Sequence, residues 1–188
     1  MVTIESQFFV ARIGGREVTD FLLDCTDDRY RQWWPETHLA LHAVSRGRDH
    51  VGDVVLMDEY VGKRRVRMLA IVVQVVPGQK VTWQLRKGLR LPVWLTLELA
   101  DRGGGVDLRH TITAGFRGVG RVLDPLLRRY LSAEFAAAMD EHARTEFALL
   151  RDHLAEPATL PDHGSHRVDR PTKPRFALAP LIGVVASR

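Results

Sequence analysis

The sequence predicts an α+β domain in which a curved antiparallel sheet of about seven strands wraps around one long C-terminal helix, with two short helices after the first strand. Three observations predict this fold. Most segments between residues 37 and 116 alternate apolar and polar residues, as half-buried strands do. Tight turns separate these segments, which favours an antiparallel meander. Residues 122–154 then carry an apolar stripe with the period of an amphipathic helix.

The predicted elements follow in order from the N-terminus. Residues 3–13 are predicted to form the first strand, and residues 16–34 two short helices that end before Pro35, because proline cannot continue a helix. Further strands are predicted at 37–45, 53–61, 64–76, 80–86, 92–100 and 106–116. Pro77-Gly78 predicts a turn, since proline presets the first turn residue and glycine accepts positive φ at the next. Asp124 and Pro125 are predicted to start one continuous helix that ends at 154.

Composition narrows the possible functions. The chain has 188 residues, a formal net charge of +4 and one cysteine, Cys25, which excludes an intramolecular disulfide and a zinc site built from several cysteines. No apolar run reaches the ~20 residues of a membrane-spanning helix. The first residues lack the basic start and apolar block of a signal peptide. A mild positive charge is also small for a nucleic-acid-binding protein. We therefore expect a cytoplasmic protein that neither binds nucleic acid nor spans a membrane.

Residues 155–188 differ in kind from the rest. Their first part is rich in proline, histidine and charge and has no periodicity, which predicts a flexible tail. Residues 176–186 are apolar again, so this stretch could dock on the domain, join two copies into a homodimer, or stay exposed. We therefore expect a ligand-binding domain at 1–154 and a flexible or docked tail at 155–188.

Four segments resemble a known superfamily: VTDFLLDCTDDRYRQWWPE after the first strand, GDVVLMDEY, the turn VVPGQKVTW, and the closing helix LLRRYLSAEFAAAMDEHARTEF. With the order of elements over residues 4–154, they resemble the SRPBCC superfamily. These START-like helix-grip proteins include lipid-transfer domains and polyketide cyclases and aromatases. The resemblance implies a cavity between sheet and helix that takes an apolar or aromatic small molecule or a lipid. Because no phosphate loop, nucleophile elbow or paired zinc-ligand spacing occurs, we expect no cofactor and no metal.

Candidate cavity residues follow from the predicted inward faces. They are Tyr60, Arg67, Trp83, Leu97, Leu108, His110, Ile112, Phe116, Leu131, Phe135, Met139 and His142. His110, His142 and Tyr60 are the candidate acid–base groups, since histidine exchanges protons near neutral pH. Alternatively, each histidine is a wall residue that makes one hydrogen bond.

Two orientations stay open at this stage. On the strand at 53–61, either Asp58 and Tyr60 or Met57 and Glu59 face inward. An inward Arg67 could meet an anionic ligand group, whereas an outward one is a solvated sheet residue.

Three functions are compatible with these observations. The first is a protein that binds or carries a small apolar, aromatic or lipid-like molecule. The second is an enzyme of the polyketide cyclase or aromatase type that uses cavity histidines and a tyrosine. The third is an interaction protein with an occluded cavity, which uses its basic rim and apolar C-terminus to contact a partner. We expect the binding protein rather than the enzyme.

Overall fold

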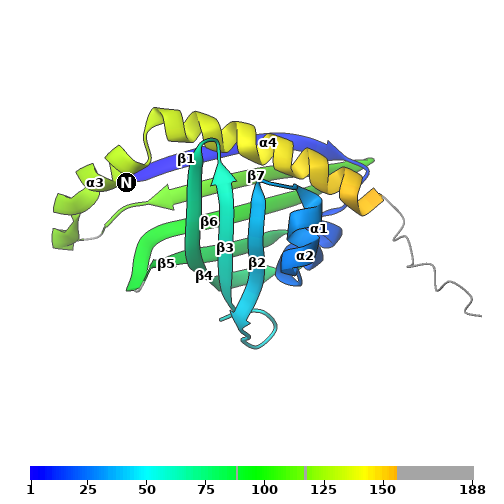
Figure 1. Cartoon of the computed structure of the whole chain (residues 1–188), viewed down its shortest axis with the longest axis horizontal. Helices are drawn as coiled ribbons and strands as arrows, with labels where there is room; N and C mark the ends of the chain where they lie inside the picture. The colour runs from blue at the N-terminus through cyan, green and yellow to red at the C-terminus, as the bar shows by residue number, and fades with distance from the viewer. Residues whose placement is uncertain (88, 117, 156–188) are drawn as a thin grey trace, which may run out of the picture. The chain divides into compact units, whose positions relative to one another are not determined.

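The computed structural model describes residues 1–87, 89–116 and 118–155. Within this part, seven strands form one antiparallel sheet in the order β1-β7-β6-β5-β4-β3-β2 (Figure 1). The strands are β1 (Val2–Ala11), β2 (His38–Ser45), β3 (Val54–Val61), β4 (Arg64–Val76), β5 (Lys80–Lys87), β6 (Leu89–Arg102) and β7 (Gly105–Ala114). The first strand pairs with the last, so the meander from β2 to β7 is extended by β1 at its far edge.

The two short helices occupy the positions that the sequence predicts, and the C-terminal helix covers most of its predicted range. The two short ones, α1 (Gly15–Leu23) and α2 (Asp27–Trp33), follow β1, and α4 (Ala133–Ala155) packs along the sheet and against α2 (Figure 1). This is the predicted helix-grip arrangement. No helix in the described ranges is long and apolar enough to cross a membrane. The predicted tail lies outside the described residues from residue 156 onward, and with it the proposed docking or dimer contact of 176–186.

The predicted continuous helix over 122–154 is wrong at its N-terminal end. The structure has a 3-10 helix at Gly118–Leu123, a short helix α3 (Asp124–Tyr130), and a break before α4. Ser132 causes the break, because its hydroxyl accepts a hydrogen bond from the backbone N–H of Phe135 at 3.2 Å, as an N-cap does. Asp124 accepts the backbone N–H of Phe116 at 3.0 Å and so holds the segment before it. The apolar stripe continues across the break, which is why periodicity alone does not reveal it.

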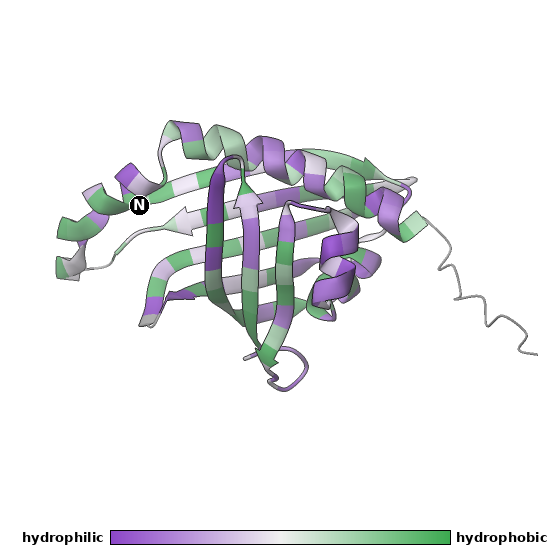
Figure 2. Ribbon diagram, in the orientation of Figure 1, coloured by the Kyte–Doolittle hydropathy of each residue, from purple (hydrophilic) through white to green (hydrophobic). Residues whose placement is uncertain are grey.

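Alternation and turn chemistry explain the sheet. Along β7 the buried residues alternate with more exposed ones, and the alternation of apolar and polar residues is visible along the strands in Figure 2. Gly78 has a φ of +75°, as predicted for the Pro77-Gly78 turn. Two apolar clusters fill the space between sheet and helices. Leu85 and Leu95 pack against both clusters and therefore mark the middle of the interior.

Candidate functional site: a cavity with one charged end

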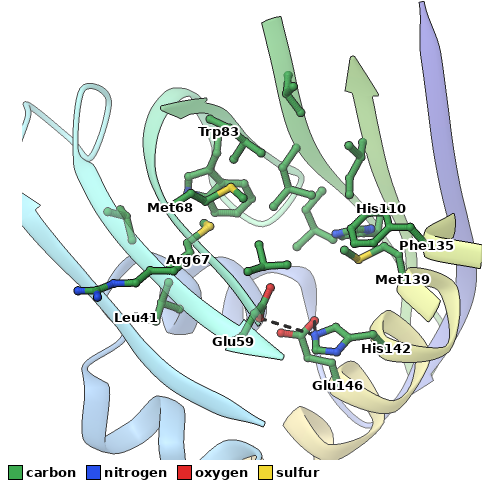
Figure 3. A pocket seen from close by; sticks show the side chains of 18 of the residues that line it. Leu41, Glu59, Arg67, Met68, Trp83, His110, Phe135, Met139, His142 and Glu146 are labelled. Carbon is green, nitrogen blue, oxygen red and sulfur yellow. Dashed lines mark ion pairs between the residues drawn. The ribbon is translucent and has the colours of Figure 1, made fainter. Parts of the chain in front are cut away.

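A cavity of about 370 Å³ lies in the interior of the described domain. Its walls come from β2 to β7 and from the helices α1 to α4. Most side chains that face it are apolar, among them Leu95 and Leu97. Figure 3 shows three others, Trp83, Phe135 and Met139. A cavity of this size is about ten times the volume that one water molecule occupies in the liquid, so it is far larger than an ordinary packing void.

Nine of the twelve predicted residues line this cavity. They are Arg67, Trp83, Leu97, His110, Ile112, Leu131, Phe135, Met139 and His142. The structure brings these nine together because inward-facing positions of the strands meet the apolar stripe of the helices.

Three predicted residues do not line the cavity. Tyr60 lies on the opposite face of β3 and is 37% exposed, so it is no candidate for chemistry inside. Leu108 is buried in one apolar cluster, where it pairs across the sheet with Leu99. Phe116 lies beyond the end of β7, in the connection to the 3-10 helix. For Tyr60 the prediction chose the wrong face of β3, and for Leu108 and Phe116 it extended the inward face of β7 further than the cavity reaches.

The structure shows which residues of β3 face the cavity. Met57 and Glu59 line the cavity, and Asp58 is buried on the other side, where the guanidinium of Arg65 donates two hydrogen bonds to it at 2.7 and 2.8 Å. Arg67 approaches the same carboxylate at 3.4 Å with its side chain 64% exposed. Arg67 therefore lies at the exposed rim, with its guanidinium on the outer face of the sheet beside Asp58 rather than inside the cavity.

Four ionisable side chains gather at one end of the cavity. His38 on β2, Glu59 on β3, and His142 and Glu146 on α4 place one atom each within 4.8 Å of one another. His142 Nε2 lies 3.6 Å from Glu59 Oε2, and His38 Nε2 lies 3.3 Å from Glu146 Oε1. Figure 3 shows Glu59, His142 and Glu146 directed toward one another, with His110 apart from them. We refer to these four residues as the His–Glu cluster.

Aromatic residues of α2 hold the cluster in place. The Tyr30 hydroxyl donates a hydrogen bond to Glu59 Oε2, and the Tyr30 ring stacks on His38 with centroids 3.8 Å apart. The indole N–H of Trp33 donates to the backbone carbonyl of Glu146 at 2.7 Å, which fixes α4 at this point. The cluster is therefore built by three elements and supported by a fourth.

Interactions within the cluster favour the charged forms of Glu59 and His142. Burial by itself raises the pKa of Glu59, but contact with His142 and the hydrogen bond from Tyr30 outweigh burial and lower it. For His142 the directions are reversed. Burial by itself lowers its pKa, but contact with Glu59 and Glu146 outweighs burial and raises it. The pKa of Tyr30 is raised well above its usual value by burial and by Glu59, so Tyr30 stays a hydrogen-bond donor.

His110 occupies the opposite kind of environment. It lines the cavity from β7, is 8% exposed, and its Nδ1 has no hydrogen-bond partner. Burial lowers its pKa, only partly offset by Glu146 and Glu59. At neutral pH it is therefore an uncharged wall residue.

Sequence reasoning missed three residues of this end: Tyr30, His38 and Glu146. One signal was available for Glu146, because residues four apart on a helix share a face and His142 was already assigned to the inward stripe. Nothing local marks Tyr30 and His38, which reach the site from α2 and β2 only after the chain folds.

Comparison with known proteins supports the fold. No family model matches the chain, and no curated protein does either. Among solved structures, the chain is similar to Ara h 8.0201 (TM-score 0.56, 12% identity, covering 82% of this chain and 99% of that one). It is also similar to the protein TTHA0849 from Thermus thermophilus (TM-score 0.54, 14% identity, 81% and 97%).

A third similar structure is the di-domain ARO/CYC BexL from the BE-7585A biosynthetic pathway (TM-score 0.53, 14% identity, 82% of this chain). This chain spans about half of that protein, 51% of its length. The structural neighbours are START-like, SRPBCC-type proteins at low identity, which confirms the helix-grip fold that the sequence predicts.

Proposed function

We propose that this protein binds or carries a small, mainly apolar molecule in the cavity between the sheet and α4. The observation that carries the proposal is the cavity itself. Its volume of about 370 Å³ lies within the roughly 300–1,000 Å³ typical of small-molecule sites, and such sites combine apolar walls with a few placed polar groups. Here the polar groups are concentrated at the His–Glu cluster.

The arrangement of the rim supports entry of a ligand. Tyr130 lines the cavity and is 50% exposed, so the boundary of the cavity at α3 reaches solvent. An apolar molecule that fills the interior removes the walls from water without disturbing the sheet. This supports a ligand-binding protein over an interaction protein with an occluded cavity.

Fluorescence of the uncharged probe N-phenyl-1-naphthylamine tests the proposal. We expect saturable binding with one site per chain, and loss of most of that binding in Leu95→Trp, which adds bulk in the middle of the interior. Val119→Trp is the matched control, because Val119 is 96% exposed. Equal binding by both variants, or no saturable binding by the native chain, would contradict the proposal. Native mass spectrometry of freshly purified protein then identifies any bound molecule.

A second function is favoured by one specific observation: His110 and His142 line the same cavity. Two histidines from different elements can act as acid and base on a carbonyl chain, as an enzyme of the polyketide cyclase or aromatase type requires. The test is incubation with a synthetic poly-β-carbonyl thioester and chromatography of the products. Cyclised product that disappears in both His110→Asn and His142→Asn supports the enzyme, and a product pattern equal to that without protein rejects it.

A further inference from the structure

The His–Glu cluster has the chemistry of a metal site. Imidazole nitrogen and carboxylate oxygen are ligands that first-row divalent transition metals accept. Two of the four side chains come from the neighbouring strands β2 and β3, and two come from adjacent turns of α4. They therefore converge from opposite sides on one point.

The distances within the cluster fit a small cation. The four nitrogen–oxygen contacts form a ring: His38 to Glu146 at 3.3 Å, Glu146 to His142 at 3.8 Å, His142 to Glu59 at 3.6 Å, and Glu59 to His38 at 4.0 Å. A tetrahedral zinc ion with bonds of about 2.0–2.1 Å separates neighbouring ligand atoms by about 3.4 Å. Glu146 presents a different oxygen to each histidine, and one atom from each of the four side chains lies within 4.8 Å of the others. Binding of the ion therefore requires the four side chains to move inward.

The two histidines carry unpartnered nitrogens. Nε2 of His38 and Nε2 of His142 are buried and make no hydrogen bond, and the two side chains are 0% and 4% exposed. Buried polar atoms without a partner are rare in proteins, so these two require an explanation. Both nitrogens face carboxylate oxygens at distances and angles that do not form hydrogen bonds.

The tautomer of His38 strengthens this point. Its Nδ1 lies 3.2 Å from the backbone carbonyl oxygen of Tyr30, which can only accept, so Nδ1 carries the hydrogen. In the neutral ring, Nε2 then has a free lone pair that faces Glu146 Oε1 at 3.3 Å. Two facing lone pairs repel unless a proton or a metal ion lies between them. Proteins also orient a metal-binding histidine in this way: its other ring nitrogen donates a hydrogen bond to a backbone carbonyl.

Residues next to the cluster hold the candidate metal ligands in place. The Tyr30 hydroxyl donates to Glu59, and the indole of Trp33 holds the backbone of Glu146. Such second-sphere hydrogen bonds fix the direction of ligating side chains.

We propose that His38, Glu59, His142 and Glu146 bind one divalent transition-metal ion of the Zn²⁺ type. Four protein ligands make a closed site of the structural kind, which would join α4 to β2 and β3 at one end of the cavity. The two imidazole ligands select against Mg²⁺ and Ca²⁺, which prefer oxygen. The sequence predicts no metal because the four ligands are spread over positions 38 to 146 without a local motif.

Titration of the full chain with Co²⁺ and Zn²⁺ after treatment with a chelator tests the proposal. All proteins carry His163→Asn and His166→Asn, so that these two histidines of the predicted tail do not bind the added metal. We expect one equivalent of Co²⁺ with the intense visible absorption of a tetrahedral ion, and displacement by Zn²⁺ but not by Mg²⁺. Because losing a second-sphere partner costs 10–100-fold in affinity, Glu146→Gln and His142→Asn should each cost at least about 100-fold, and Tyr30→Phe about 10-fold.

His50→Asn is the matched control, because His50 contacts Asp53 and Asp24 in a separate histidine–carboxylate group and should leave the affinity unchanged. Thermal unfolding without metal verifies that each variant folds, and Zn²⁺ should raise the midpoint of the parent protein but not that of the ligand variants. Should one ligand variant fail to fold, Glu59→Gln takes its place. Absence of stoichiometric binding by the parent, or equal affinity in the ligand variants, would overturn the proposal and leave a buried ion-pair network.

The proposed metal site is independent of the proposed apolar ligand. Metal binding is measured without any organic probe, and probe binding is measured in chelator. One proposal can therefore fail while the other holds.

Discussion

His110 and His142 line the same cavity, yet their surroundings give them opposite properties. His110 lies on β7 among apolar side chains, and burial lowers its pKa. His142 lies on α4 beside Glu59 and Glu146, and these carboxylates raise its pKa in spite of burial. The same residue type is a neutral wall residue at one place and a member of a charged group at the other.

The difference shows that the cavity has an apolar part and a charged end. Its apolar part offers apolar surface, whose burial is favourable and non-directional. Its polar end supplies directional groups that are buried and held by Tyr30 and Trp33. A substitution at the polar end should therefore lower the free energy of unfolding through lost polar contacts, and one at the apolar part through lost packing.

Glu59→Ala should have the largest effect. It removes the acceptor of the Tyr30 hydroxyl and the carboxylate nearest to His142, so Tyr30 loses its hydrogen bond and His142 its nearest opposite charge. Breaking a buried pair on one side costs several kcal/mol, and we expect a loss of ~3 kcal/mol in the free energy of unfolding without metal. Urea denaturation measures it. Glu5→Ala is the control, because Glu5 is 43% exposed and its contact with Arg109 at 4.0 Å is loose. A similar loss in both variants would contradict the distinction.

Met139→Ala tests the apolar part. Met139 is 7% exposed and faces the cavity, so the substitution removes buried apolar atoms and enlarges existing space. Truncations of this kind cost 2–5 kcal/mol, and we expect about 2 kcal/mol because the side chain is packed on only part of its surface. Leu126→Ala, at a position 66% exposed, should change the stability by less than ~0.5 kcal/mol. An unfolding free energy for Met139→Ala equal to that of Leu126→Ala would show that this wall contributes no packing.

His110→Leu should have a small effect that depends on pH. The pKa of His110 in the folded protein lies below its ordinary value of 6.5, so below about pH 6.5 the unfolded chain binds a proton that the folded chain does not. The native protein therefore loses stability from this group as pH falls from 6.5 to the folded pKa, and His110→Leu does not. The carboxylates of Glu59 and Glu146 oppose this shift, and His142 adds to it.

We expect the two proteins to differ by less than ~0.5 kcal/mol near pH 7.5, since the replaced Nδ1 has no partner. Near pH 5.5 the variant should be more stable by up to ~1 kcal/mol. Paired urea curves at both pH values measure the difference, in which the other titrating groups cancel. A difference that does not change with pH would mean that the pKa of His110 is the same in the folded and the unfolded chain.

The fold was predictable because its signals are local. The alternation along β7, the Pro77-Gly78 turn and the stripe through Phe135 and Met139 each lie within a few residues. The break at Ser132 was missed because the stripe passes through it unchanged. The helix period carries no information about a cap that interrupts it.

The site was only half predictable, for a physical reason. On β3 the adjacent Asp58 and Glu59 are both charged, so alternation cannot say which one faces inward. The structure shows that Asp58 is buried on the other face through its bonds to Arg65. His38 joins the cluster through sheet pairing and contact with α2, which no local pattern encodes. The apolar wall follows from periodicity, whereas the polar end depends on contacts between distant segments.

The rim at Arg65 and Arg67 should show the smallest effects and defines where the polar end stops. Asp58 receives two hydrogen bonds from Arg65, which lower its pKa, and a longer contact of 3.4 Å from Arg67. Both arginines are at least half exposed, so solvent screens these pairs. We expect Arg67→Gln to change the unfolding free energy by less than ~0.5 kcal/mol and Arg65→Gln to cost more, because it leaves a buried carboxylate with one weaker partner. Urea denaturation of both variants in low salt measures the difference. A larger cost for Arg67→Gln would place this side chain in the interior network rather than at the solvent-exposed edge of the cavity.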